Sequence, residues 1–309
     1  MRLLLFTRKT LRDCASPKLL LAFLVPYFGL AILLSVLFGE FVSDDIGSAP
    51  LFTQEQALVE LYTQLSFVWL VAFPMVFIAV LSAVVVAGES ERGTLRILLS
   101  KPVHRWEVLA GKFVGVTIFG FLSMLAGLFV GATALSVTTG VSPMALGGGI
   151  LTLLPGTLLY ALFVAIVVTA VGTLVGVLTG SRLKTMLVTL LFPVLFFAFI
   201  FVKQLQIGEF YGRYFLYVPD VNYHLGNVYL LVQEAVGPGF NPETQTALAT
   251  VSGVYDTSAT WHDSLLEGIV GTVPLAGYVS PVVSAVLLVG FTVVVLAGAF
   301  LTFNRMDIN

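Results

Sequence analysis

The sequence predicts an all-α polytopic membrane protein with six transmembrane helices, an N-terminal amphipathic helix and both termini in the cytoplasm. Only 10% of the 309 residues are charged and 58% are hydrophobic, and the mean hydropathy is +1.01. These values lie outside the range of soluble globular proteins. Several uncharged runs reach the roughly 20 residues that an α-helix needs to cross a bilayer. Cations gather on one side of the predicted spans, as expected for cytoplasmic loops.

The first segment, residues 1–18, is predicted to form an amphipathic helix that lies on the membrane surface. At about 100° per residue, Arg8 and Arg12 share one arc and leucines occupy the opposite arc. Ser16 and Pro17 supply a helix cap and a first-turn proline for the span that follows. That apolar run is too long for a cleaved signal peptide, and no A-x-A site follows it.

Six apolar runs are predicted to cross the membrane within a single transmembrane domain, residues 1–309. The run from Phe113 to Ser181 contains no Asp, Glu, Lys, Arg or His and is long enough for two spans joined by a turn-rich segment. The predicted spans are residues 19–39, 65–87, 112–136, 150–178, 185–202 and 281–303. A cytoplasmic loop at 88–111 and an extracytoplasmic loop at 203–280 separate them.

Charge asymmetry supports this topology, because cytoplasmic loops of membrane proteins carry an excess of Lys and Arg. Of the 15 cations, 13 fall on the predicted inner side: Arg2, Arg8, Lys9, Arg12, Lys18, Arg92, Arg96, Lys101, Arg105, Lys112, Arg182, Lys184 and Arg305. Twelve of the 17 acidic residues fall on the outer side. Both termini are therefore predicted to be cytoplasmic.

The outer loop contains two short apolar pieces, at residues 228–232 and 265–278. We expect neither piece to cross the membrane. The second piece is interrupted by Glu267 and Pro274 and is predicted to be an interfacial or re-entrant segment before the last span.

Several function classes are disfavoured by what the sequence lacks. The predicted spans contain no ionisable residue in their interior, which argues against a proton-coupled carrier. A single cysteine, Cys14, excludes a disulfide framework, and the histidines are too far apart in sequence to suggest a metal site. No G-x-x-x-x-G-K-[ST] motif is present. We therefore expect no catalytic residues, no metal, no bound cofactor and no nucleic-acid partner.

Small residues recur every fourth position in the fourth predicted span, at Gly172, Gly176 and Gly180. Such spacing lets helix backbones approach closely. The glycines are predicted to pack against another helix of the same chain, with a dimer contact as the alternative.

One of the most charged stretches of the chain lies between the second and third spans, from Gly88 to Lys112. Gly93 permits a turn, Thr94 can cap a helix, and Pro102 can start the next one. Between them, a short helix would present leucines on one side, as a helix that docks in a partner's groove does. The alternative is an ordinary positive-inside loop. The residues that would form the docking element are Glu89, Glu91, Arg92, Gly93, Thr94, Leu95, Leu98, Leu99, Pro102, Arg105 and Lys112.

The run E-x-E-R-G-T-L-x-x-L-L-S-x-P-V-x-R-W-E-V-L-x-G-K, at residues 89–112, resembles the signature loop of type-2 ATP-binding-cassette (ABC) transporter permeases. These proteins are the membrane subunits of exporters. The ending F-N-R-M-D-I, Phe303 to Ile308, resembles the F-x-R-x-D-I ending common in this family, and the N-terminal segment resembles its elbow helix. The long loop at 203–280 is similar to that of the branch with permeases for copper-enzyme maturation, sodium efflux and drug efflux.

This resemblance implies that residues 93–100 form a coupling helix that docks on a cytoplasmic ABC ATPase dimer. Glu89 and Glu91 would lie at its start, and Arg105 and Lys112 would anchor the third span. Two permease copies would pair in the plasma membrane, and ATP would bind to the partner subunits. Two alternatives remain: a carrier or channel that works without an ATPase, and a membrane anchor or force-transmitting sensor that acts through the outer loop.

Overall fold

The computed structural model describes residues 2–40, 46–93, 104–204, 208–253 and 277–305. Within these residues every regular element is a helix, and six helical runs are long and apolar enough to cross a membrane. The fold class predicted from the sequence is thereby confirmed. The six runs are Pro17–Glu40, Leu51–Glu91, Arg105–Thr139, Pro143–Thr179, Arg182–Lys203 and Pro281–Arg305.

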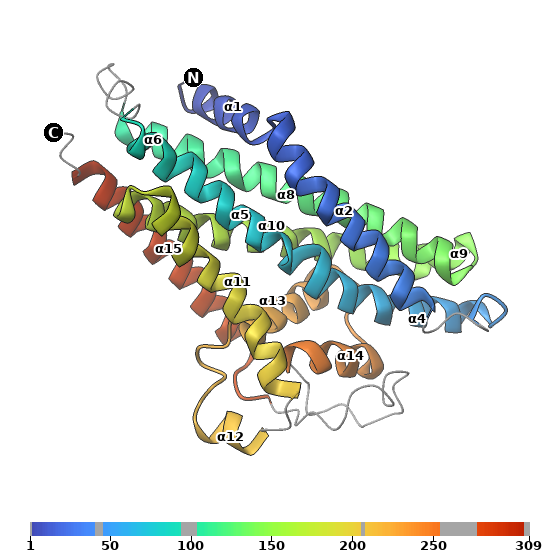
Figure 1. Cartoon of the computed structure of the whole chain (residues 1–309). Helices are drawn as coiled ribbons and strands as arrows, with labels where there is room; N and C mark the ends of the chain where they lie inside the picture. Colours follow the sequence, from blue (N-terminus) through green and yellow to red (C-terminus); the bar gives the residue numbers. More distant parts are fainter. Residues whose placement is uncertain (1, 41–45, 94–103, 205–207, 254–276, 306–309) are drawn as a thin grey trace.

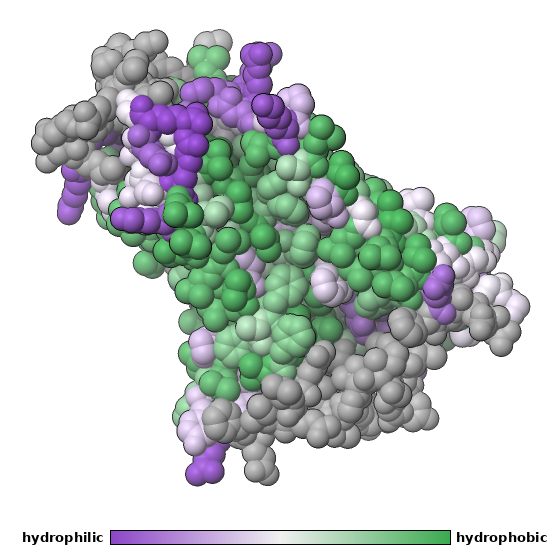
Figure 2. Space-filling model, viewed as in Figure 1, coloured by the Kyte–Doolittle hydropathy of each residue, from purple (hydrophilic) through white to green (hydrophobic). Residues whose placement is uncertain are grey.

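The two ends of the helical bundle are formed by different elements (Figure 1). Helices α1 (Arg2–Cys14) and α6 (Gly88–Glu91) lie at one end, together with the C-terminal end of α15 (Pro281–Arg305). We call this the inner end, because the predicted cytoplasmic cations lie there. Figure 2 shows hydrophilic side chains gathered at the inner end and a broad hydrophobic surface over the sides of the helices. The opposite end is the outer end.

Helix α1 lies across the start of α8 (Arg105–Thr139) (Figure 1). Two glycines of α8 make this close approach possible. A Cβ added at Gly115 would stand 2.7 Å from the Thr10 Cβ, and one added at Gly111 would overlap the Phe6 Cβ. The small residues of α8 therefore seat the amphipathic helix against the third span.

The second span is one long run of α4 (Leu51–Gln64), η1 (Leu65–Ala72), α5 (Pro74–Ser82), η2 (Ala83–Ala87) and α6. A π-helical stretch, η1, comes directly before Pro74, where the Phe73 N–H bonds the Val68 carbonyl at 3.2 Å. Because Pro74 has no N–H to offer, the carbonyl of Leu70 loses its usual α-helical donor. The Tyr27 hydroxyl of α2 (Pro17–Glu40) donates to that carbonyl instead, at 2.6 Å.

Replacing Tyr27 by Phe is expected to lower the free energy of unfolding by about 1–3 kcal/mol, because a buried carbonyl would lose its partner. Tyr27 is only 1% exposed. Thermal unfolding of the purified protein in detergent measures the effect. Thr133→Val is the control, since that hydroxyl lies on an exposed face of α8 and bonds only its own helix. Equal melting temperatures for the two variants would contradict the prediction.

Helix α10 (Ile150–Thr179) and the second span are the most buried of the six runs and form the core. Gly140, with φ of 61°, ends α8, and the short helix α9 (Pro143–Gly148) leads into α10. Gly180, with φ of 57°, ends α10 before α11 (Arg182–Gln204). Positive φ values suit glycine at helix ends, because a Cβ is disfavoured there.

The outer region contains three described helices, α12 (Gly208–Arg213), α13 (Val221–Val236) and α14 (Pro242–Ser252). Of these, α13 packs against α10, α11 and α15 (Figure 1). The sequence suggested only a short apolar piece at 228–232, so the extent and burial of this helix were not predicted. The other expected piece, 265–278, lies almost wholly outside the described residues.

Candidate functional site

Only part of the predicted docking element lies in the described residues. Glu89 and Glu91 lie in α6, Arg92 and Gly93 follow it, and Arg105 and Lys112 lie in α8. Residues 94–103, which include the predicted Thr94, Leu95, Leu98, Leu99 and Pro102, lie outside the described residues. The structure therefore describes this site through the contacts that the residues at the two ends of the segment make with other helices.

Gly93 turns the chain away from the end of α6. Its φ is 71°, and its N–H donates to the Ser90 carbonyl at 3.1 Å. A side chain at this φ would be strained even though no atom lies within 4 Å of an added Cβ. Glycine is thus required here by backbone conformation.

The carboxylate of Glu89 joins three segments of the chain. Its Oε2 lies 2.6 Å from the Lys112 Nζ of α8, and its Oε1 lies 3.0 Å from the Lys9 Nζ of α1. Lys112 is only 5% exposed, and its ammonium also donates to the Val85 carbonyl at 2.8 Å. An ammonium so deeply buried needs its anionic partner, so Glu89 fastens the start of the loop firmly to α8.

Glu91 connects the same region to α11. Its Oε2 accepts the Arg182 backbone N–H at 3.2 Å and lies 3.5 Å from the Arg182 Nε. The Arg182 guanidinium also donates to the Gly88 carbonyl at 3.4 Å. From the sequence, Arg182 was interpreted as a topology signal alone, because its contact with Glu91 spans 91 residues of chain and leaves no local pattern.

At the other end of the segment, α8 begins with a capping box. The His104 N–H donates to the Glu107 carboxylate at 3.3 Å. Arg105, the first residue of the helix, donates from Nη1 to the Asn304 carbonyl of α15 at 3.1 Å. The exit of the loop is therefore held to the last span as well as to the third.

The glycines singled out in the fourth span lie along one contact with the second span. A Cβ at Gly172 would overlap the Ser82 side chain, and one at Gly176 would stand 2.9 Å from the Val86 Cβ. Gly180 ends α10, and an added Cβ there would lie 3.4 Å from the Ser90 Oγ. The geometry places these glycines against α5, η2 and α6 of the same chain.

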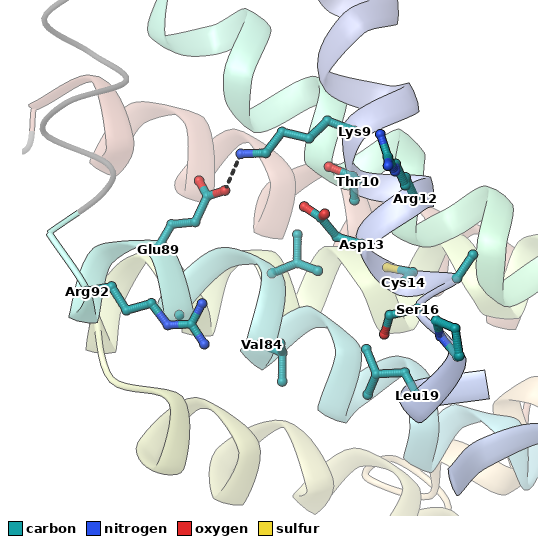
Figure 3. Close-up of a pocket in the computed structure, with 14 residues that line it drawn as sticks. Lys9, Thr10, Arg12, Asp13, Cys14, Ser16, Leu19, Val84, Glu89 and Arg92 are labelled. Carbon is teal, nitrogen blue, oxygen red and sulfur yellow. Dashed lines mark hydrogen bonds and ion pairs between the residues drawn. The ribbon is translucent and has the colours of Figure 1, made fainter. Parts of the chain in front are cut away.

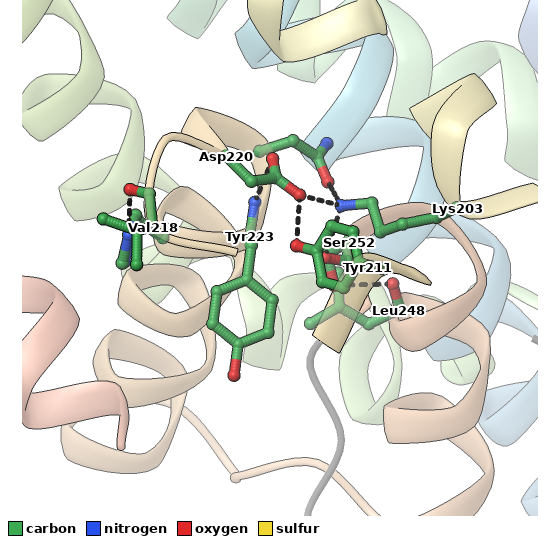
Figure 4. Close-up of polar contacts among 9 residues, drawn as sticks. Lys203, Tyr211, Val218, Asp220, Tyr223, Leu248 and Ser252 are labelled. Atoms are coloured by element: carbon green, nitrogen blue, oxygen red, sulfur yellow. Dashed lines mark hydrogen bonds and ion pairs between the residues drawn. The ribbon is translucent and has the colours of Figure 1, made fainter. Parts of the chain in front are cut away.

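A buried polar cluster at the outer end joins α11 to the outer helices (Figure 4). The Lys203 Nζ lies 2.9 Å from the Asp220 Oδ2 and donates to Asn222 Oδ1 and to the Ser252 carbonyl, at 2.5 and 2.7 Å. The Tyr211 hydroxyl donates to Asp220 at 2.6 Å. Burial, and then the Asp220 charge, raises the pKa of Tyr211, so its hydroxyl stays a donor.

Helix α13 is held in the bundle by two further sets of hydrogen bonds. The Tyr229 hydroxyl lies 2.9 Å from the Ser66 Oγ and 3.0 Å from the Thr157 Oγ1. Gln233 donates to Thr157 and to the Leu153 carbonyl, both at 3.0 Å. These bonds satisfy polar groups that would otherwise be costly at this depth.

On its other side, α13 is bonded to α15. The His224 Nε2 lies 3.1 Å from the Val218 carbonyl, which can only accept, so Nε2 carries the proton. Nδ1 is then left to accept from the Ser284 hydroxyl, at 3.0 Å, and Asn227 donates to the same hydroxyl at 2.8 Å. The structure thus gives His224 a role in packing α13 that the sequence did not suggest. Within the described residues, no group of three His, Cys, Asp or Glu is arranged to hold a metal ion.

Two ionisable side chains just beyond the predicted spans are buried. Lys203, on the outer side as predicted, is buried at the end of α11, and Glu60 is buried in α4. Lys203 has its anionic partner Asp220 seventeen residues along the chain, and Glu60 lies in a helix that extends beyond the predicted span.

Comparison with known families adds a decisive observation. The family described as ABC-2 family transporter protein matches residues 20–308. The chain belongs to the ABC-2 transporter family. No curated protein matches the chain. The resemblance seen in residues 89–112 and 303–308 is thereby confirmed.

Membership in the ABC-2 family, together with six candidate spans in the described residues, makes this chain a multi-pass permease of the plasma membrane. ABC-2 permeases are generally the non-catalytic membrane subunits of ABC transporters. The described residues of the predicted docking element lie at the two ends of the loop after the second span.

Proposed function

We propose that this chain is an exporter-type permease subunit whose loop at 88–111 couples it to a separate cytoplasmic ABC ATPase dimer. Two permease copies form the translocation path, and ATP binds to the partner subunits, so this chain needs no cofactor of its own. The leucines of residues 94–100 dock in a groove of the ATPase, as amphipathic helices do in their partners.

One observation carries this proposal: both ends of the loop are tied to helices that are far apart in the sequence. Glu89 binds α1 and α8, Glu91 binds Arg182 of α11, and Arg105 binds the end of α15. A displacement applied to the loop would therefore act on four helices together. An ordinary positive-inside loop requires no such fastening, because solvated cations suffice to set topology.

The proposed cycle follows from these ties. Closure of the ATPase dimer on ATP pulls the two loops toward each other, and the tied helices tilt with them. The helices then open a path to the outer side. The described part of the region 203–280 includes α13, which packs within the bundle, so this region is integrated with the spans that would move.

The double variant Leu95→Glu and Leu98→Glu is expected to lose its ATPase partner. Two carboxylates in an apolar contact cost several kcal/mol, so association should weaken by about 100-fold or more. The affinity-tagged chain is purified from its native membranes, and ATP hydrolysis in the eluate is measured per permease. Leu95→Met, which keeps the apolar volume, should retain the activity.

Two outcomes would refute the proposal. Wild-type protein that elutes without any ATP hydrolysis, or a double variant that retains all of it, would remove the coupling role. Solute movement by the purified chain alone in liposomes would favour an ATPase-independent carrier. If only changes in the outer loop impair function, the sensor alternative is favoured.

A further inference from the structure

A cavity of about 780 Å³ opens at the inner end, between α1 with the start of α2 on one side and η2 with α6 on the other (Figure 3). Lys9, Arg12 and Asp13 line the first side, and Val84, Glu89 and Arg92 line the second. The Lys9 side chain reaches across the cavity to Glu89, as the dashed line in Figure 3 shows. The family's coupling role does not use this space.

Some charged groups of the cavity have partners of opposite charge among the described residues, and others do not. The Glu89 carboxylate is already held by Lys112 and Lys9, at 2.6 and 3.0 Å. The guanidinium groups of Arg12 and Arg92, in contrast, make no hydrogen bond or ion pair with any described residue. Asp13 is the remaining carboxylate in the lining. With two guanidiniums and one remaining carboxylate in its lining, the cavity has an excess of positive charge suited to a phosphate group.

An adjoining hollow of about 630 Å³ extends this charge along the surface of α1. It shares Lys9 and Arg12 with the cavity and adds Arg8 beside Leu5 and Leu11. Cations and leucines thus adjoin on this surface of α1, as expected of an interfacial amphipathic helix.

Apolar side chains of the lining adjoin these charges. Pro17 and Leu19 come from the start of α2, and Val84 and Val85 come from η2; of these, Val84 is 37% exposed. Leu5 of α1 is 65% exposed. A soluble anion would gain nothing from this surface, whereas the acyl chains of a lipid would cover it.

We propose that this cavity binds the headgroup of an anionic phospholipid from the inner leaflet. The phosphate lies between Arg12 and Arg92, and the acyl chains lie beside Leu19 of α2 and Val84 of η2. The lipid thereby bridges α1 and the start of the coupling loop, next to the Lys9 and Glu89 ion pair. Anionic lipid in the inner leaflet would fix the position of α1 relative to the loop.

Binding of short-chain lipids to the full-length protein in a neutral detergent tests this proposal. Dioctanoyl phosphatidylglycerol carries the anionic headgroup and the chains, dioctanoyl phosphatidylcholine carries chains without net charge, and glycerol phosphate carries the anion without chains. Native mass spectrometry gives the affinity of each. We expect Arg12→Gln with Arg92→Gln to weaken phosphatidylglycerol binding by about 30-fold, the effect of two cations at an anionic surface.

Three matched variants make the result decisive. Arg12→Lys with Arg92→Lys should keep most of the affinity, which separates lost charge from lost folding. Lys184→Gln removes an exposed cation at the same end but outside the cavity and should have no effect. Equal losses in Lys184→Gln and the double Gln variant would indicate diffuse surface charge and overturn the site. Glycerol phosphate binding as tightly as the lipid would show a soluble-anion site instead, and equal affinity for both lipids would also refute the proposal.

Discussion

Replacing Lys203 by Met is expected to cause the largest loss of stability of any single change outside the loop. Asp220 is fully buried, and its carboxylate would lose its only cation among the described residues while keeping bonds from Tyr211 and the Tyr223 N–H. An unpaired buried charge of this kind costs about 3–5 kcal/mol. Thermal unfolding in detergent, followed by size-exclusion chromatography, should show a sharply lower melting temperature.

A second substitution tests the cause of this loss. Adding Asp220→Asn to Lys203→Met removes the uncompensated charge while keeping an acceptor for the Tyr223 N–H, so much of the stability should return. Lys184→Met removes an exposed lysine of the same helix and should leave the melting temperature unchanged. If Lys203→Met melts like the wild type, the cluster in Figure 4 does not hold the outer helices to α11.

The second large effect is expected from Glu89→Lys, which would bring three ammonium groups together at positions 9, 89 and 112. Lys112 is too deeply buried for water to screen this repulsion, so α1 should separate from α8. Cys14, at the end of α1, reports this motion because it is the single cysteine of the chain. Its rate of alkylation by a maleimide is the measurement.

The expected change in rate follows from the thiol pKa. Burial, with a smaller effect of the Asp13 charge, raises the pKa of Cys14 from 9.0 to about 12. Because the thiolate is the reacting species, the wild-type protein should react very slowly at pH 8 and faster only as the pH approaches 12. Release of α1 would return the pKa toward 9.0 and raise the rate by up to about 1,000-fold.

The matched control for this experiment lies two residues along the chain. Glu91→Lys removes the tie to Arg182 of α11 but leaves Lys9 and Lys112 paired with Glu89, so Cys14 should stay slow. Lys112→Glu combined with Glu89→Lys re-forms one ion pair in reverse and should recover part of the protection. Equal acceleration by Glu91→Lys and Glu89→Lys would show that α1 does not depend on Glu89.

Hydropathy and charge were sufficient to predict the six spans, their order and the position of the loop, because each of these depends on local composition. The same pattern could not predict α13. Its apolar residues are interrupted by His224, Asn227 and Gln233, whose partners Ser284, Thr157 and Leu153 lie in distant spans. The polar side chains that make this segment resemble a loop find their hydrogen-bond partners in other helices, α10 and α15.

The predicted docking element was likewise only partly predictable from the sequence. The motif identified Glu89, Arg105 and Lys112 as a group, since they lie in one charged stretch, but it did not show what each one contacts. Their described partners Lys9, Val85 and Asn304 are spread over three other helices. Arg182 was missed as a partner of Glu91, because a cation in a short turn is equally well explained as a topology signal.

The position of α13 has a consequence for biogenesis. This helix is too polar to enter the bilayer by itself, and its hydrogen bonds to Ser284 require α15, which is synthesised later. The first five spans can therefore insert in order during translation, but α13 can pack into the bundle only after the last span has inserted. Completion of the outer part of the fold thus depends on insertion of the last span.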